Sequence, residues 1–145
     1  MGMKFLLLAV FGIAMAHLEG VVVLYLRKAL GLIDSNSNKE VLEKFSKRYI
    51  TIEQTREAAT IVMLASLSLL VGSGWLDIIS IFLWTFAFWD LFYYASLYLL
   101  IKWPPNLKTI DVLFLIPRPW IAPVWVPVAI SSITILIIAF FYIIK

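Results

Sequence analysis

Four long apolar stretches, separated by more polar connections, dominate the pattern of this chain. They cover residues 3–26, 57–75, 78–101 and 124–144. Each meets or approaches the roughly 20 residues that a helix needs to cross the hydrocarbon core of a bilayer. The predicted fold is therefore all-α, a transmembrane four-helix bundle that forms one polytopic membrane domain over residues 1–145.

Two of the connections carry a pattern of their own. Ser37 and Glu40 form a capping box, and apolar residues follow at amphipathic spacing as far as Tyr49. This predicts a short helix that lies on the membrane surface. The apolar segment 111–120 is too short to span, and its prolines prevent a regular helix, so we expect a Pro-rich interfacial or re-entrant loop packed against protein.

The basic residues are distributed unevenly between the two sides of the predicted bundle. Six follow the first span and three follow the third, whereas the opposite side has only Lys4 and Lys145. The positive-inside rule then places both long loops and the amphipathic helix in the cytoplasm and both termini outside the inner (cytoplasmic) membrane. This asymmetry accounts for most of the net charge of +3, so we expect no nucleic-acid partner.

The composition excludes several kinds of site. The chain is 63% hydrophobic and 14% charged, far less charged than the roughly 25% of a soluble domain. It has no cysteine, which excludes disulfides, thiolate metal sites and a cysteine nucleophile. His17 is its one histidine, so a single chain cannot hold a haem between two histidines.

A stripe of small residues marks one face of the first span. Gly12, Ala16 and Gly20 recur at four-residue spacing. Small residues on one helix face allow a second helix to approach closely, so this stripe predicts a helix contact.

A set of ionisable side chains within the apolar stretches, or at the start of the second one, is the main indication of function. They are His17, Glu19, Glu53, Arg56, Glu57 and Asp90. Each costs roughly 2.5–3.5 kcal/mol at the centre of a membrane helix, so such groups usually face the bundle interior. We expect them to converge in one buried polar cluster, supported by Thr60, Tyr94 and Asp111.

Four segments resemble an uncharacterised family of small bacterial and archaeal integral membrane proteins. They read AHLEGVVVLYLR (16–27), EQTREAATIVML (53–64), FWDLFYY (88–94) and WPPNLKTIDVLFLIPRPWIAPVWVP (103–127). The resemblance implies a four-helix membrane fold, and it implies no reaction. It also implies that the family motifs include His17, Glu19, Glu53, Arg56, Glu57, Asp90 and Asp111.

Three interpretations of the polar cluster remain open. The first is a structural lock, in which Arg56 neutralises a glutamate and Tyr93 or Tyr94 satisfies Asp90. The second is a metal site for iron, manganese or zinc. Its candidate ligands are His17, Glu19, Glu53, Glu57 and Asp90. However, Glu53-x-x-Arg56 stands where a di-iron bundle would carry Glu-x-x-His. The third is a proton or ion relay, for which four helices would need an oligomer.

The functional prediction is an integral membrane protein that acts as a non-catalytic subunit or accessory component of a larger membrane assembly. The chain is small for enclosing a substrate, and its aromatic third span offers a broad packing surface. The expected partners are the lipid bilayer and other membrane subunits or further copies of this chain. The alternatives are a membrane metalloprotein or small redox enzyme and a relay, so the sequence leaves open whether the protein is an enzyme.

The predicted orientation can be tested with reporter fusions. A reporter fused after Lys145 is expected to be active on the outer side of the membrane, and one inserted after Lys108 in the cytoplasm, because the basic loops stay inside. Cytoplasmic activity of the fusion after Lys145 would show that the orientation is opposite to the predicted one.

Overall fold

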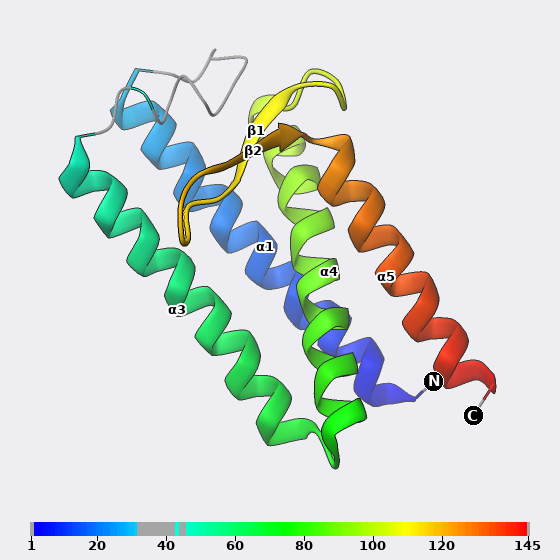
Figure 1. Cartoon of the computed structure of the whole chain (residues 1–145). Helices are drawn as coiled ribbons and strands as arrows, with labels where there is room; N and C mark the ends of the chain where they lie inside the picture. The colour runs from blue at the N-terminus through cyan, green and yellow to red at the C-terminus, as the bar shows by residue number, and fades with distance from the viewer. Residues whose placement is uncertain (1, 32–42, 44–45, 145) are drawn as a thin grey trace.

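The computed structural model describes residues 2–31, 43 and 46–144, and it has four long helices and one β-hairpin (Figure 1). The helices are α1 (Met3–Ala29), α3 (Lys47–Val71), α4 (Trp75–Ile101) and α5 (Trp125–Ile144). The strands are β1 (Ile110–Phe114) and β2 (Trp120–Pro123). The predicted amphipathic helix after Ser37 falls mainly outside the described residues.

The helices occur where the apolar stretches predicted them. In the described part of the chain, α1, α4 and α5 as far as Tyr142 are long and apolar enough to cross a membrane. Helix α3 begins at Lys47 rather than at residue 57, and its first half is polar. Its apolar part runs from Ala58 to Val71, about 21 Å of helix, which is shorter than a bilayer core of about 30 Å. Helix α3 as a fourth span stays a prediction.

Helices α1 and α4 form the closest helix contact in the structure, and the small-residue stripe lies in it. Gly12, Ala16 and Gly20 are all buried. A Cβ atom added to Gly12 would lie 2.9 Å from the carbonyl oxygen of Thr85, and one added to Gly20 would lie 3.1 Å from the Cβ of Ser96. The predicted helix contact is confirmed, and α4 is the partner.

The Pro-rich segment contains a two-stranded antiparallel hairpin, which the all-α prediction omits. Ile110 lies opposite Pro123, and Asp111 opposite Ala122. The prolines at 117 and 119 prevent a helix, as expected, but they lie in the turn between the strands. Proline has no backbone N–H to donate, but residues in the turn are not needed for hydrogen bonds between the strands. The apolar residues on either side of the turn can therefore pair. Part of the segment expected to be an interfacial or re-entrant loop thus forms a hairpin, and its interfacial or re-entrant position stays a prediction.

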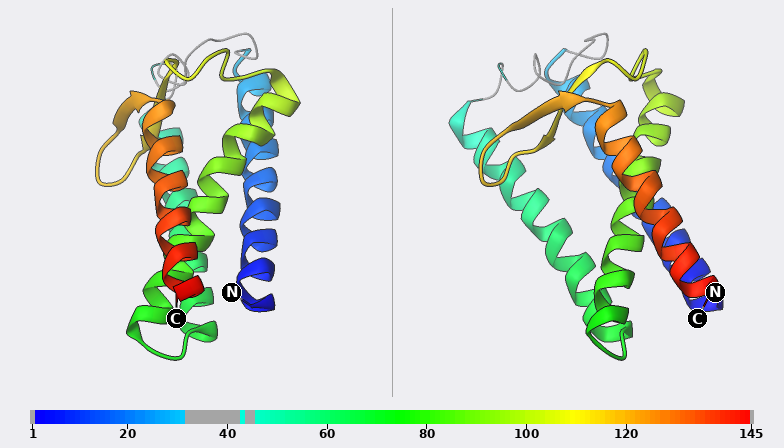
Figure 2. Two further views of the ribbon diagram at one scale, coloured as in Figure 1. Left: turned by 90° about the vertical axis from the view of Figure 1, so that its right-hand side faces the viewer. Right: turned by 45° about the vertical axis from the view of Figure 1, so that its right-hand side comes forward.

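Both termini lie at the same end of the bundle, opposite the hairpin (Figures 1 and 2). At this terminal end the carboxylate of Asp77 on α4 accepts hydrogen bonds from Lys4 Nζ at 2.8 Å and from Tyr142 Oη at 2.8 Å. Nearby, Trp84 donates its indole N–H to the carbonyl of Phe5 at 2.9 Å. These contacts connect α1, α4 and α5 at the terminal end of the bundle. The polar cluster lies at the opposite end, beside the hairpin.

We expect Gly12→Ala to reduce the free energy of unfolding by about 1–3 kcal/mol, as overpacking usually does. The new methyl group would meet a backbone carbonyl of α4, which can move only with its helix. Gly20→Ala should cost less, because the side chain of Ser96 can shift. Thermal unfolding in detergent measures the stability of both variants. Gly74→Ala is the control, because no other atom lies within 4 Å of a Cβ atom added at that position. A melting temperature of Gly12→Ala equal to that of the control would contradict the contact.

Candidate functional site

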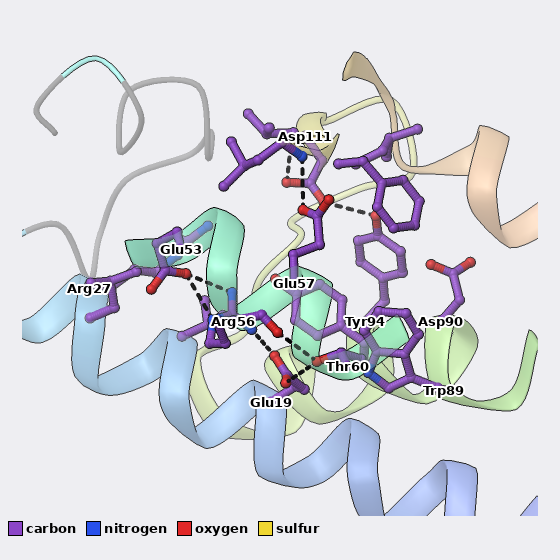
Figure 3. A pocket seen from close by; sticks show the side chains of 17 residues that line it. Glu19, Arg27, Glu53, Arg56, Glu57, Thr60, Trp89, Asp90, Tyr94 and Asp111 are labelled. Atoms are coloured by element: carbon purple, nitrogen blue, oxygen red, sulfur yellow. Dashed lines mark hydrogen bonds and ion pairs between the residues drawn. The ribbon is translucent and has the colours of Figure 1, made fainter. Parts of the chain in front are cut away.

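A cavity of about 130 Å³ lies at the hairpin end of the bundle, between α1, α3, α4 and β1 (Figure 3). Four elements from distant parts of the sequence therefore contribute side chains to one site. Its ionisable and hydroxyl-bearing lining residues are Glu19, Arg27, Glu53, Arg56, Glu57, Thr60, Asp90, Tyr93, Tyr94 and Asp111. The predicted polar cluster is thus present, except for His17.

Arg56 is the centre of the polar contacts between α1 and α3. Its Nη1 pairs with Glu19 Oε2, and its Nη2 donates to Glu53 Oε2 at 2.7 Å. Thr60, one turn further along α3, donates to the other oxygen of Glu19 at 3.1 Å. The expectation that Arg56 neutralises a glutamate is confirmed, and it pairs with two (Figure 3).

Glu57 joins α3 to the hairpin. Its two carboxylate oxygens accept the backbone N–H groups of Leu115 at 2.8 Å and Ile116 at 3.1 Å. Gln54, on the preceding turn of α3, donates to the carbonyl of Leu115 at 3.2 Å. These backbone groups lie where the chain leaves β1, so α3 supplies hydrogen-bond partners that the short hairpin cannot provide itself.

A second polar group joins α4 to β1. Asp111 is 1% exposed and accepts hydrogen bonds from Tyr94 Oη at 2.8 Å and from the N–H of Val112 at 2.8 Å. Beside it, Arg27 is 0% exposed, and its guanidinium lies 4.5 Å from the ring centroid of Trp103. Tyr93 or Tyr94 was expected to satisfy Asp90, but Tyr94 donates to Asp111 and the hydrogen-bond donor of Asp90 is Ser131.

Asp90 accepts a hydrogen bond, and its donor belongs to α5. Ser131 donates its hydroxyl to Asp90 Oδ2 at 2.7 Å. Within the described residues, no donor reaches Oδ1, and no Lys or Arg forms an ion pair with this carboxylate. The neighbouring indole N–H of Trp89 is buried without a hydrogen-bond partner in the same part of the chain. Both residues line the cavity.

Sequence reasoning missed Arg27, Trp89 and Ser131 as parts of the site. Arg27 was counted as a loop residue, yet it continues the buried face of α1 that contains Gly20 and Val23. That spacing of three and four residues was a usable signal. For Ser131 no such signal exists, because α5 carries other hydroxyl residues that bond only to their own helix.

The candidate metal ligands do not all come together. His17 is exposed and lies outside the cavity lining, whereas Glu19, Glu53, Glu57 and Asp90 line it. In the part of the chain that the structure describes, no three His, Asp or Glu side chains are grouped so that they could hold a metal ion. A metal site at these five residues therefore stays a prediction without support from this geometry.

The chain matches no protein-family model, no curated protein and no solved structure. The family resemblance stays a prediction, and the function has to be argued from the geometry of the cavity.

We expect Glu57→Gln to loosen the hairpin from α3, because an amide side chain offers one acceptor where two backbone N–H groups now donate. A hydrogen bond to a charged group contributes about 1.5–3 kcal/mol, so amide exchange at Leu115 and Ile116 should accelerate at least about tenfold. Hydrogen exchange with mass spectrometry or NMR measures this.

The matched control for Glu57→Gln is Glu53→Gln, which removes a carboxylate from the preceding turn of α3 whose hydrogen bonds go to Arg56 rather than to the hairpin. Unchanged exchange in Glu57→Gln, or equal acceleration in both variants, would show that Glu57 does not hold the hairpin.

Proposed function

We propose that this chain is an integral membrane protein that binds a small polar ligand in the cavity at the hairpin end. We further propose that it does so as a non-catalytic, accessory component of a larger membrane assembly. One observation carries the binding function. Polar side chains from three helices and the hairpin surround open volume instead of filling it.

A structural lock alone explains the contacts but not the volume. Glu19 and Glu57 have partners that hold α3 against α1 and the hairpin, and Glu53 pairs with Arg56 of its own helix. Protein interiors are nevertheless close-packed, and a lock is strongest when its groups leave no space. A cavity of about 130 Å³ is several times the roughly 30 Å³ that one water molecule occupies in the liquid. Its size supports a ligand of several heavy atoms.

The chemistry of the lining favours binding over nucleophilic catalysis. Among the residues that the structure describes, the cavity is lined by carboxylates, two guanidiniums, aromatic rings and apolar side chains, and neither histidine nor serine contributes to this lining. A nucleophile of the usual kind needs a neighbouring base that activates it, and the lining offers Thr60 as its one aliphatic hydroxyl. The hydroxyl of Thr60 already donates to Glu19.

The role in a larger assembly is supported by the outer surface. Only 11% of the most apolar window of α5 is buried within the chain. One face of this helix packs on α4, and the other presents exposed apolar residues to lipid or to another membrane subunit, namely Trp125, Ile130, Ile133, Leu136, Ile137, Phe140 and Phe141. The other functions, a metalloprotein or small redox enzyme and a proton or ion relay, have no separate observation in their favour.

Filling the cavity should abolish ligand binding. Leu26 lines the cavity, so Leu26→Trp is expected to remove any small-molecule mass that accompanies the wild type in native mass spectrometry after mild detergent extraction. Leu18→Trp is the matched control, because Leu18 lies on the same helix and is 65% exposed. The same spectra report whether other subunits remain bound.

A wild-type protein that carries no small molecule, or a Leu26→Trp variant that carries the same one, would contradict the binding function. A monomeric mass in the gentlest detergent would contradict the role in an assembly.

A further inference from the structure

The balance of charge around the cavity is strongly negative. Its lining includes five carboxylates and two guanidiniums. The carboxylates belong to Glu19, Glu53, Glu57, Asp90 and Asp111, and the guanidiniums to Arg27 and Arg56. Inside a membrane protein such charges are only weakly screened, so the surplus attracts a cation more strongly than it would in water.

The carboxylates differ in how fully the protein compensates them. Glu19 and Glu53 share Arg56, and Glu57 accepts two backbone N–H groups. Asp111 accepts a tyrosine hydroxyl and a backbone N–H. Asp90 accepts only the neutral hydroxyl of Ser131, which leaves it as the lining carboxylate with the weakest compensation among the described residues. A positive group in the cavity is therefore best placed at Asp90.

The size and the walls of the cavity decide which kind of cation fits. In the described ranges no three acidic or histidine side chains are grouped as metal ligands, and the volume of about 130 Å³ suits a molecule of several heavy atoms. Trp89 and Tyr94 contribute aromatic rings to the lining near Asp90 (Figure 3), and Tyr93 is a further aromatic residue of the lining. Aromatic rings attract organic cations and also cover apolar carbon atoms.

We infer that the ligand of this cavity is a small organic amine in its ammonium form, with its N–H groups donating to Asp90 and its carbon chain against the aromatic wall. This inference rests on the proposed binding function and names the chemical class of its ligand. A primary ammonium fits better than a quaternary one, because Asp90 has an oxygen that no donor of the described residues reaches.

The test compares three probes of similar shape and different charge on the purified full-length chain in detergent: butylammonium, butan-1-ol and butyrate. Isothermal titration calorimetry should show that butylammonium binds at least about tenfold more tightly than butan-1-ol, and that butyrate does not bind. The wild type alone gives this result, so the test does not depend on the folding of a variant.

Two variants then test whether the ammonium group binds at Asp90. Asp90→Asn should weaken butylammonium binding at least about tenfold while leaving butan-1-ol binding nearly unchanged. Glu43→Gln removes a carboxylate from an exposed position outside the cavity lining and should bind butylammonium as the wild type does.

The outcomes separate this inference from the proposed function. If butan-1-ol or butyrate binds as well as butylammonium and Leu26→Trp abolishes that binding, the cavity is a binding site but its ligand is not a cation. If butylammonium binds equally to the wild type and to Asp90→Asn, the ammonium does not lie at Asp90 and the inference fails. If none of the three probes binds, the inference also fails. The proposed binding function is then still tested by native mass spectrometry, which shows whether a small molecule accompanies the wild type.

Discussion

The hairpin end of the bundle depends on the ion pair between Arg56 of α3 and Glu19 of α1. Helix α1 packs closely on α4, and α4 on α5, whereas α3 packs on α4 without comparable packing on α1. The long side chains of Arg56 and Glu19 therefore span the distance between α3 and α1, whose backbones do not approach closely. The space that remains between these helices is the cavity, so the same contact holds α3 in place and keeps the site open.

Much of this arrangement could be predicted from the sequence, because it follows from local patterns. Hydropathy locates the helices, and the small residues at Gly12, Ala16 and Gly20 identify the face of α1 that approaches α4. The face of α3 that contains Thr60, Leu64 and Ser68 is buried, as its four-residue spacing indicates. Most of the ionisable residues inside the apolar stretches do converge, since isolated charges are too costly there.

The remaining features depend on contacts between residues far apart in the chain. The hairpin forms because the prolines fall in its turn and because Glu57 and Gln54 of α3 satisfy its backbone, and neither fact can be read from segment 111–120 alone. Tyr94 donates to Asp111 rather than to Asp90, although Asp90 is one turn away on the same helix. Periodicity cannot distinguish these partners, because the choice depends on where β1 crosses α4. His17 illustrates the opposite error, since an ionisable residue in an apolar stretch can also face outward.

The attachment of α3 to the hairpin has a consequence for biosynthesis. Glu57 and its partner Leu115 are separated by 58 residues, and synthesis proceeds from the N-terminus. When α3 leaves the ribosome and meets the membrane insertion machinery, Glu19 of α1 is already available to Arg56, whereas the backbone partners of Glu57 have not yet been made. The carboxylate of Glu57 therefore lacks these two backbone donors until β1 and the residues after it have been synthesised. A nascent chain that stops before residue 115 would therefore lack the backbone partners of Glu57, and its α3 would be held by contacts with α1 and α4.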